Sequence, residues 1–563
     1  MGRAAIGPGS QYYLERLTLN IFLFDLIQFN SIRLDPIAGS WQFNDMLACI
    51  ILVSWLALLW LYFLWSRRRY YKAAWQLPGP VGWPFIGMGL QMMNPQTFLQ
   101  YMDGLSHKYK APFISWMGTN CFLYVNDPQT VEQIFNSTHC TNKGDFYRFM
   151  SSAIGDGLFT SSSPRWQKHR RLINPAFGRQ ILCNFLPIFN AEADVLLEKL
   201  DVEGVQRGKS LEIYEILKKI VLEAACQTTM GKRMNFQHDG SKAIFEAYSG
   251  ITEVCVKRML SPWLYPELIY RWSRLFDRQQ KVVGVLFGFV EQLLQPAVSV
   301  VGVEDSDANK QLEEEQHQHQ HQHQRQQQQQ RRIKSKSIFI EQVREHVERG
   351  QQMSWQDVRD EANVIIAATF ETTSTALYFT ILCLAMHPEY QEKLHDELCA
   401  ELPEHGDISI EQLERLSYTE MAINESMRLF APVPMVLRRA GQDLELRRDD
   451  GVYLIPSGTQ IGIDIYNMQR DVRVWGPLAR TYNPEAHFGP DAPTRHAFAF
   501  VPFTKGLRMC IGYRYALLLM KLLLAKIFRC YRISTAARLE QLLVKGNISL
   551  KLKEYPLCRV ERR

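Results

Sequence analysis

Residues 503–512 read FTKGLRMCIG and lead directly into a long apolar segment at 513–528. Gly506 permits a tight turn with positive φ just before the cysteine. If residues 513–528 form a helix, its first backbone N–H groups lack partners within the helix. Together with the positive helix end, they favour a thiolate at Cys510. An isolated cysteine before a helix is usually a small buried apolar residue, but the complete spacing F-x-x-G-x-R-x-C-x-G indicates a functional sulfur.

This spacing resembles the haem-ligand loop of the cytochrome P450 monooxygenases. The resemblance implies that the Cys510 thiolate is the metal ligand, bound axially to haem iron. It also implies that Phe503 packs beside the sulfur and that Arg508 binds a haem propionate. The implied cofactor is haem b, held non-covalently except for the Cys510–iron bond. The implied fold is mainly α with a small β portion, the cytochrome P450 fold, in one large domain.

A second motif lies 82 residues before the cysteine, where Glu425 and Arg428 form the pattern E-x-x-R. At this spacing a carboxylate and a guanidinium meet on one helix face, and such a pair alone is common on surfaces. Its place before the cysteine loop resembles the buried structural pair of the family. The family's third partner is an arginine that the stretch 482–488, YNPEAHF, lacks. Asn483 and His487 are the two alternatives for that place.

Three arginines, Arg170, Arg438 and Arg508, are expected to neutralise the two haem carboxylates, because buried charges need partners. Trp166 and Arg170 lie four residues apart, which places them on one helix face and by itself indicates only an ordinary aromatic–cation pair. The resemblance implies that both bind a propionate. It assigns the same role to Arg438.

The apolar segment 354–386 carries an acid and an alcohol side by side, Glu371 and Thr372. A polar pair of this kind can simply bend a helix, because threonine can bond back to a carbonyl. The resemblance implies instead that the two are catalytic and deliver protons during dioxygen reduction. Thr369 stands where the family has a glycine that opens a groove for oxygen.

The stretch 495–503, RHAFAFVPF, resembles the animal microsomal branch that contains fatty-acid ω-hydroxylases and many insect members. In that branch a glutamate often esterifies the haem, and Ala368 occupies its position, so we expect no ester bond here.

Composition sets wider limits on the 563-residue chain. With 46% hydrophobic and 22% charged residues it is typical of a globular protein, which excludes a wholly disordered, collagen-like or coiled-coil chain. A net charge of +6 does not favour a nucleic-acid partner. Eleven scattered cysteines do not favour a disulfide scaffold.

Residues 46–65 carry no charge and, as a helix, would span about 30 Å, the thickness of a bilayer core. The alternative is a buried core helix. Basic residues follow the segment, at 67–69 and at Lys72, which places the chain after it on the cytosolic side. No cleavage site follows, so we expect an uncleaved transmembrane anchor with residues 1–45 as a lumenal extension.

The remaining chain divides into three parts. Residues 66–89 form a basic, proline-rich hinge, and residues 90–563 form the cytosolic catalytic domain. A Gln/His-rich insert at about 303–334 has too few apolar residues to fold and is expected to be disordered. Its alternating histidines can bind a metal adventitiously, but a repeat expansion is favoured; they are His317, His319, His321 and His323. Helices are expected at 190–200, 211–230, 337–350 and 354–386, and strands at 452–455 and 459–465.

The resemblance implies a membrane-bound monooxygenase of the endoplasmic reticulum that inserts one oxygen atom of O2 into a lipophilic substrate: a fatty acid, a steroid or a xenobiotic. NADPH would supply electrons through NADPH–cytochrome P450 reductase, with cytochrome b5 as a second candidate donor. A basic docking face for the reductase could consist of Lys505, Arg514 and Lys521. The alternative is that these are ordinary solvent-exposed side chains. Substrate contacts are expected in 146–158 and 232–260. Two alternatives keep the fold: a degenerate haem binder, and an oxygen-independent hydroperoxide isomerase or dehydratase.

Overall fold

The computed structural model describes residues 43–80, 82–83, 86–237, 242–295, 340, 353–404 and 406–563. Three of the features predicted above lie outside these residues: most of the N-terminal extension, the Gln/His-rich insert with its four histidines, and the helix predicted at 337–350 apart from residue 340.

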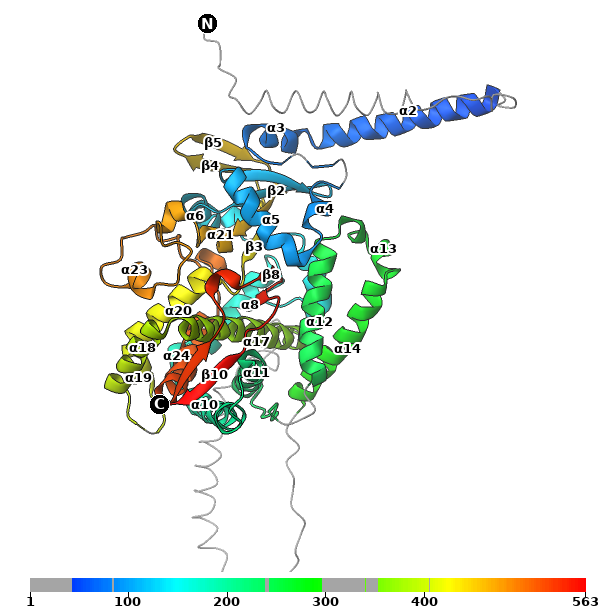
Figure 1. The fold of residues 1–563 in the computed structure, drawn as a ribbon. Helices are drawn as coiled ribbons and strands as arrows, with labels where there is room; N and C mark the ends of the chain where they lie inside the picture. The colour runs from blue at the N-terminus through cyan, green and yellow to red at the C-terminus, as the bar shows by residue number, and fades with distance from the viewer. Residues whose placement is uncertain are drawn as a thin grey trace, which may run out of the picture.

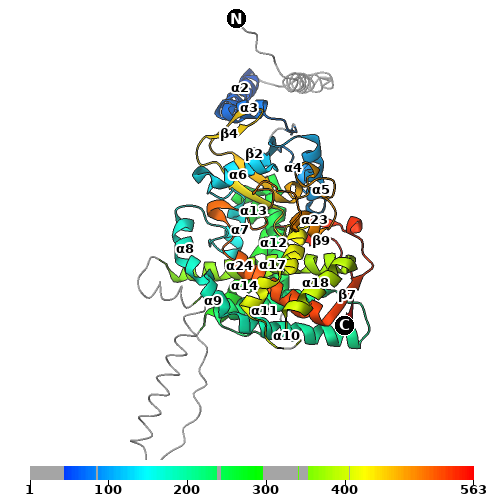
Figure 2. The ribbon, with the colours of Figure 1, turned by 90° about the vertical axis from the view of Figure 1, so that its left-hand side faces the viewer.

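A helical body surrounds the long helix α17 (Trp355–Met386), which runs through its middle (Figures 1 and 2). Ser354 caps this helix: its hydroxyl accepts the Asp357 N–H, and the Asp357 carboxylate accepts the Ser354 N–H. The helix ends at Met386. Pro388 disfavours a helical conformation at the residue before it, His387. Three of the helices that pack on α17 are α11 (Ile213–Met230), α20 (Ser417–Leu429) and α24 (Tyr513–Cys530), while α10 (Leu186–Leu200) packs against α11 and α24.

Most of the other helices lie on the outside of this core. Helices α12 (Lys242–Met259) and α14 (Arg274–Leu294) lie side by side along one flank (Figure 1). The shorter ones are α3 (Arg68–Gln76), α4 (Gly89–Met92), α5 (Pro95–Lys108), α6 (Pro128–Asn136), α7 (Tyr147–Ile154), α8 (Arg165–Ile173), α9 (Arg179–Cys183), α13 (Glu267–Arg271), α18 (Pro388–Glu401), α19 (Ile410–Arg415), α21 (Ile465–Met468), α22 (Val472–Trp475) and α23 (Pro484–Phe488).

The β portion is small and lies mainly at the end of the molecule near α3 (Figure 1). A four-stranded sheet has the order β1 (Phe113–Met117), β2 (Asn120–Val125), β6 (Gln460–Asp464) and β3 (Met435–Arg439). Its pairs are antiparallel except β2 with β6. The two-stranded sheets are β4 (Leu444–Arg448) with β5 (Gly451–Ile455), β7 (Tyr531–Thr535) with β10 (Cys558–Arg562), and β8 (Val544–Gly546) with β9 (Leu550–Leu552). Strands β5 and β6 confirm the two predicted strands.

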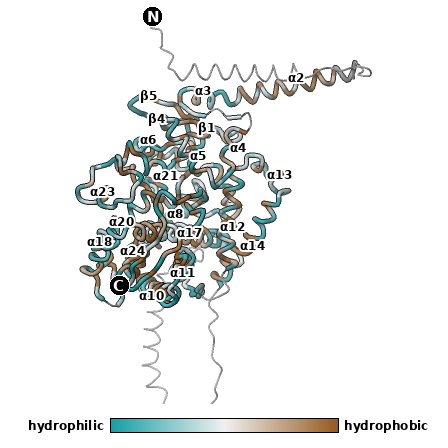
Figure 3. The backbone as a smooth tube through the Cα atoms, in the orientation of Figure 1, coloured by the Kyte–Doolittle hydropathy of each residue, from teal (hydrophilic) through white to brown (hydrophobic). Residues whose placement is uncertain are grey.

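Two described helices are long and apolar enough to cross a membrane, and their burial separates them. The span in α17 is 78% buried, so that helix belongs to the core. Helix α2 (Phe43–Ser66) is 0% buried over its apolar span and extends away from the body (Figures 1 and 3). The buried-core alternative for residues 46–65 is therefore wrong, and α2 is a candidate membrane span. Helix α3 joins it to the body, where Ala73, Ala74 and Leu77 pack into the core of the four-stranded sheet.

Candidate active site

The loop before α24 presents Cys510 through an ordered turn. The Cys510 N–H donates to the Phe503 carbonyl at 3.0 Å, and the Met509 N–H donates to the Gly506 carbonyl at 3.1 Å. Gly506 has φ +72°, and a Cβ there would lie 2.2 Å from the carbonyl oxygen of Phe135. Both the conformation and the close approach require glycine, as the sequence predicted.

The Cys510 sulfur lies in an unusual environment. The side chain is exposed, yet burial raises the pKa of its thiol, so the exposed sulfur faces the inside of the protein. A hydrogen bond from the Gly512 backbone and the charges of Arg170 and Lys143 act against burial and lower that pKa. A cation bound to the sulfur would favour the thiolate over the thiol.

Two cations, Lys143 and Arg170, act directly on this sulfur, and Arg438 and Arg508 complete a cluster of four cations with them. Burial, together with the charges of Arg438 and Arg170, lowers the pKa of Arg508 to about 9. Burial, Arg438 and Arg508 likewise hold the pKa of Lys143 well below its usual range. Among the ion pairs of the described residues, none joins these four side chains to a carboxylate of the chain. The cluster is therefore positive charge without carboxylate counterions among the described residues; Arg438 is fully buried, and the other three side chains are partly buried.

The geometry of Arg508 shows how this cluster is held. Its Nε donates to the Thr141 carbonyl at 2.8 Å and one Nη to the Ser161 carbonyl at 2.9 Å, while its buried second Nη has no hydrogen-bond partner. Its guanidinium carbon lies 3.9 Å from the centre of the Trp166 ring. An unpartnered buried N–H next to a cluster of cations fits a dianionic ligand, so the residues present fit the two carboxylates of haem.

Lys143 was missed by the sequence analysis because no motif surrounds it. Residue 143 is paired through its backbone with Arg438, and its Nζ lies over the rings of Tyr147 and Phe159 at 4.3 and 5.0 Å. Only this long-range pairing brings the lysine to the other cations.

The middle of α17 has one partly exposed face, which we call the open face. Ala367, Ala368, Thr369 and Thr372 are half-buried, whereas residues 360–366 and 373–385 on either side are buried throughout. Phe370 points elsewhere: it is fully buried, with its ring 5.7 and 5.5 Å from those of Phe245 and Tyr248 on α12. Thr369, and not the bulkier Phe370, therefore adds side-chain volume to the open face.

The predicted acid and alcohol are both on α17 but have different partners. The Thr372 hydroxyl donates to the Ala368 carbonyl at 2.7 Å. The Glu371 carboxylate accepts a hydrogen bond from the Ser549 hydroxyl at 2.7 Å and pairs with Lys551 at 2.8 Å. Ser549 and Lys551 lie at the β8–β9 hairpin, and Ser549 is 178 residues after Glu371 in the sequence. No local sequence pattern predicted their contact with Glu371.

The Glu425–Arg428 pair is fully buried on α20 and completely satisfied. Two guanidinium nitrogens bind the two carboxylate oxygens at 2.7 and 2.9 Å. The remaining N–H groups donate to three carbonyls in two other segments, at Gln469 and at Ala479 and Thr481.

The third partner of this pair is settled by contact. His487 Nδ1 lies 2.9 Å from Glu425 Oε1, so the imidazole takes the place of the family's arginine. Asn483 contributes only its backbone N–H, at 2.8 Å, and its side chain caps α23.

The suggested basic docking face is wrong for Lys521. This side chain is buried, pairs with Glu420 at 2.6 Å and donates to the Leu413 carbonyl. Lys505 is half-buried and its Nζ donates to the Ala497 carbonyl, whereas Arg514 is exposed. Lys521 follows the cysteine loop closely in the sequence. On α24, however, its side chain points toward α19 and α20 and away from solvent.

Comparisons with known proteins agree with this arrangement. Residues 77–559 match the family model described as cytochrome P450. The chain is 79% identical over 518 residues to the Drosophila melanogaster protein "Probable cytochrome P450 313b1", covering 92% of this chain and all of that protein. It is 36% identical over 522 residues to "Probable cytochrome P450 313a4" of the same organism, with the same coverage.

A relative from the branch suggested by residues 495–503 is also similar. "Cytochrome P450 4c3" of Drosophila melanogaster is 28% identical over 494 residues, which covers 87% of this chain and 89% of that protein. The observed fold is mainly helical with a small β portion, as predicted. The chain belongs to the cytochrome P450 family, whose members are haem-dependent monooxygenases.

Proposed function

We propose that this enzyme is a membrane-bound haem-thiolate monooxygenase that inserts one oxygen atom of O2 into a lipophilic substrate, with electrons from NADPH. The observation that carries the proposal is a single inward-facing cysteine sulfur next to a cluster of four partly or fully buried cations that pair with no carboxylate among the described residues. A ligand that carries a metal ion able to bind a thiolate, together with two carboxylates, would pair with both the sulfur and the cations.

The proposed cofactor is haem b, which when bound supplies the iron that activates dioxygen. Cys510 would be its protein ligand, with the Gly512 N–H directed at the sulfur and Phe503 beside it. Five side chains would hold the two propionates, and they are Lys143, Trp166, Arg170, Arg438 and Arg508. Ala368 offers no carboxyl group for an ester.

Thr372 and Glu371 are the proposed catalytic residues. The Thr372 hydroxyl lies on the open face of α17, so its O–H can turn from the Ala368 carbonyl toward the oxygen being reduced. Glu371 lies behind it, where Ser549 and Lys551 hold its carboxylate. Protons would pass from Glu371 to Thr372 through water, since no hydrogen bond joins the two side chains directly in the described contacts.

Glu425 and Arg428 are the proposed structural pair. Arg428 binds the Gln469 carbonyl, and the Gln469 side chain in turn accepts the Val501 N–H at 2.9 Å, directly before the cysteine loop. The pair thereby connects α20 to the segment that presents Cys510.

For the membrane arrangement we propose α2 as the anchor, with residues 1–45 lumenal, 66–89 as the hinge and 90–563 as the cytosolic catalytic domain. The exposed apolar span of α2 and the basic residues after it support an endoplasmic-reticulum location. NADPH–cytochrome P450 reductase is the proposed electron donor, with cytochrome b5 as a second donor. A tethered enzyme of this kind suits a fatty acid, steroid or xenobiotic that partitions into the bilayer.

An oxygen-independent hydroperoxide isomerase or dehydratase is the second candidate. Thr369 favours it, because a β-branched residue occupies the open face where the family has glycine. The degenerate haem binder is less favoured, because His487 completes the structural pair that the sequence left incomplete.

The test is the reduced carbon-monoxide spectrum of the membrane-expressed chain, followed by NADPH-dependent oxygen consumption with added reductase. We expect a red-shifted Soret band in wild type and its loss in Cys510→Ala, with Cys530→Ser as an exposed-cysteine control. Metabolite profiling of Cys510→Ala against wild-type cells then identifies the substrate. A Soret band without the thiolate shift in wild type overturns the proposal. A shifted band without NADPH-dependent turnover favours the two alternatives: the isomerase or dehydratase if an added hydroperoxide is converted, and the degenerate haem binder if it is not.

A further inference from the structure

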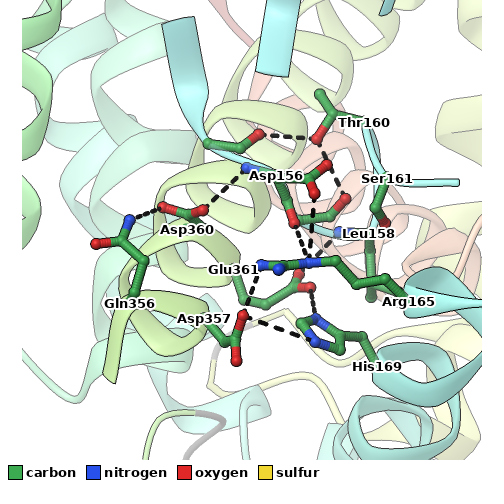
Figure 4. A network of polar contacts seen from close by, with 12 residues as sticks. Asp156, Leu158, Thr160, Ser161, Arg165, His169, Gln356, Asp357, Asp360 and Glu361 are labelled. Carbon is green, nitrogen blue, oxygen red and sulfur yellow. Dashed lines mark hydrogen bonds and ion pairs between the residues drawn. The ribbon is translucent and has the colours of Figure 1, made fainter. Parts of the chain in front are cut away.

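Three acidic residues in the first two turns of α17, Asp357, Asp360 and Glu361, hold the loop that leads into α8 and the start of α8 (Figure 4). Glu361 is fully buried and uses both oxygens: Oε1 lies 2.7 Å from His169 Nδ1, and Oε2 accepts the Leu158 N–H at 3.0 Å. Asp360 accepts the Asp156 N–H at 3.0 Å. The Glu361 carboxylate on α17 thus binds both the loop and the imidazole of α8.

The loop is shaped for this contact by two glycines. A Cβ at Gly157 would lie 2.9 Å from Glu361 Oε2, and one at Gly155 would lie 2.8 Å from the Asp360 carboxyl carbon. Gly155 also has φ +99°, a conformation that side chains strain to adopt. The backbone can approach the carboxylates this closely only because neither residue has a side chain.

Charged groups surround the pair on its outer side. Arg165, the first residue of α8, donates to Asp357 at 2.6 Å and to the Asp156 carbonyl at 3.1 Å. Asp357 Oδ1 also lies 3.9 Å from His169 Nε2. Both nitrogens of the imidazole therefore face acids of α17, and Arg165 balances the outer acid.

Two routes lead from Glu361 to the proposed propionate-binding side chains. Along α8, His169 shares the buried face with Trp166 and directly precedes Arg170. Along the loop, the Ser161 carbonyl accepts one Nη of Arg508 at 2.9 Å. Both routes meet where Arg508 stacks on Trp166, 3.9 Å from the ring centre.

Burying a carboxylate and an imidazole is costly, and apolar side chains of similar size would pack these elements as well. Unlike apolar contacts, the hydrogen bonds of the Glu361–His169 pair are directional. They therefore fix the rotation of α8 and the path of the loop relative to α17. We propose that Glu361 and His169 are positioning residues for the haem-propionate site, holding Trp166, Arg170 and Arg508 in register with α17. This inference rests on the proposed haem-thiolate function.

The experiment measures transfer of haem from the full-length holoprotein to excess apomyoglobin, together with its thermal unfolding midpoint. In Glu361→Leu, the His169 Nδ1 and the Leu158 N–H lose their partner. We expect haem to leave about tenfold faster or more, as when residues that orient a ligand are lost. In Glu361→Gln, the amide oxygen still accepts the Leu158 N–H and the amide N–H can bond a neutral imidazole. Haem loss should then stay within about threefold of wild type.

Glu223 on α11 provides the matched control. It is equally buried and accepts two backbone N–H groups, from Met234 at 2.7 Å and Phe236 at 3.0 Å, without contacting α8 in the described hydrogen bonds. We expect Glu223→Leu to lower the unfolding midpoint as much as Glu361→Leu does but to leave the rate of haem loss close to that of wild type. Equal rates in these two variants would assign Glu361 a purely structural role and overturn the proposal, as would rapid haem loss from Glu361→Gln.

The double variant Glu361→Leu/His169→Leu keeps the test decisive if the single variant does not accumulate, because it leaves no buried charge behind. It should unfold near the wild-type midpoint and still lose haem faster; slow loss would overturn the proposal. A wild-type chain that binds no haem overturns the proposed function and this inference with it. A wild-type chain that binds haem while Glu361→Leu retains it overturns this inference alone.

Discussion

Two charge clusters in this protein differ in whether the chain itself supplies partners for all of their charged groups. Around Arg428, every guanidinium N–H has an acceptor, and the charge is cancelled by Glu425 on the same helix. Around Arg508, three further cations crowd together, one Nη has no partner, and in the described contacts no carboxylate of the chain pairs with the group.

The difference separates structure from ligand binding. A buried ion pair that is complete within the chain holds segments together, and here it joins carbonyls of two stretches to α20. A buried cation cluster that is incomplete destabilises the fold unless an anion arrives from outside, because each charge has lost its water. The incomplete cluster is therefore the better indicator of a binding site, and the predictions below test this distinction.

The largest effect is expected at the complete cluster. Arg428→Met leaves the Glu425 carboxylate buried without its cation, which should lower the free energy of unfolding by about 3–5 kcal/mol. Urea unfolding followed by tryptophan fluorescence measures this, provided that the variant accumulates. A loss below about 1 kcal/mol would show that the pair is not the structural centre that its contacts indicate.

At the incomplete cluster, the same kind of substitution should act in opposite directions on the two forms of the protein. Lys143→Met keeps the packing against Tyr147 and Phe159 but removes one of the repelling charges. We expect the haem-free protein to gain about 1 kcal/mol and the haem-bound protein to lose haem about tenfold faster, a factor equal to about 1.4 kcal/mol.

Differential scanning calorimetry and haem transfer measure the two effects of Lys143→Met. Lys526→Met serves as control, because Lys526 is paired with Asp194 at 2.8 Å. If the Lys143 variant destabilised both forms alike, the cluster would be an ordinary part of the fold.

Glu192 represents an intermediate case, a buried charge that a proton can cancel. Burial raises the pKa of Glu192 to about 7; a hydrogen bond from Gln227 lowers it and the nearby Glu223 raises it further. Since the folded pKa lies above the unfolded value of about 4.3, the stabilisation is complete below pH 4.3 and is lost as the pH rises through about 7.

Glu192→Gln should therefore be more stable than wild type above pH 7.5, by about 1–2 kcal/mol after allowance for solvent screening. The two proteins should converge near pH 5. Thermal unfolding midpoints between pH 5 and 8 check this, and a constant difference over that range would contradict the raised pKa.

The smallest effect is expected for an exposed pair. Arg179 and Glu414 lie 2.8 Å apart, but both side chains are more than half exposed, at 60% and 55%. Glu414→Ala should change the free energy of unfolding by less than about 1 kcal/mol and should leave haem binding unaltered. A larger change would mean that buried and exposed pairs do not differ here as their surroundings indicate.

Much of the fold and the site was predictable because the relevant patterns are local. The loop from Phe503 to Gly512, the helix after it and the pair Glu425–Arg428 are encoded by spacing within one turn or one helix. The same holds for α2, whose uninterrupted apolar run needs no partner to be recognised. The roles assigned to Cys510, Trp166 and Arg438 remain predictions, although the structure brings these residues together.

Other features depend on contacts between distant segments. Lys143 joins the cation cluster through backbone pairing with Arg438, and Lys551 reaches Glu371 from the C-terminal hairpin. The sequence left Asn483 and His487 as alternatives for the third partner of the Glu425–Arg428 pair. In the structure, the His487 side chain contacts Glu425. Lys521 was misplaced because spacing along a helix does not say which face meets the core.

The sequence by itself determined the family, the cysteine loop, the exposed apolar helix and the identity of most charged residues at the site. Tertiary structure alone decided which of those charges are cancelled and which are left without partners. The reason is physical: a periodic pattern fixes how a segment folds locally, whereas the cost of a buried charge depends on every group that surrounds it, and these groups come from elements hundreds of residues apart.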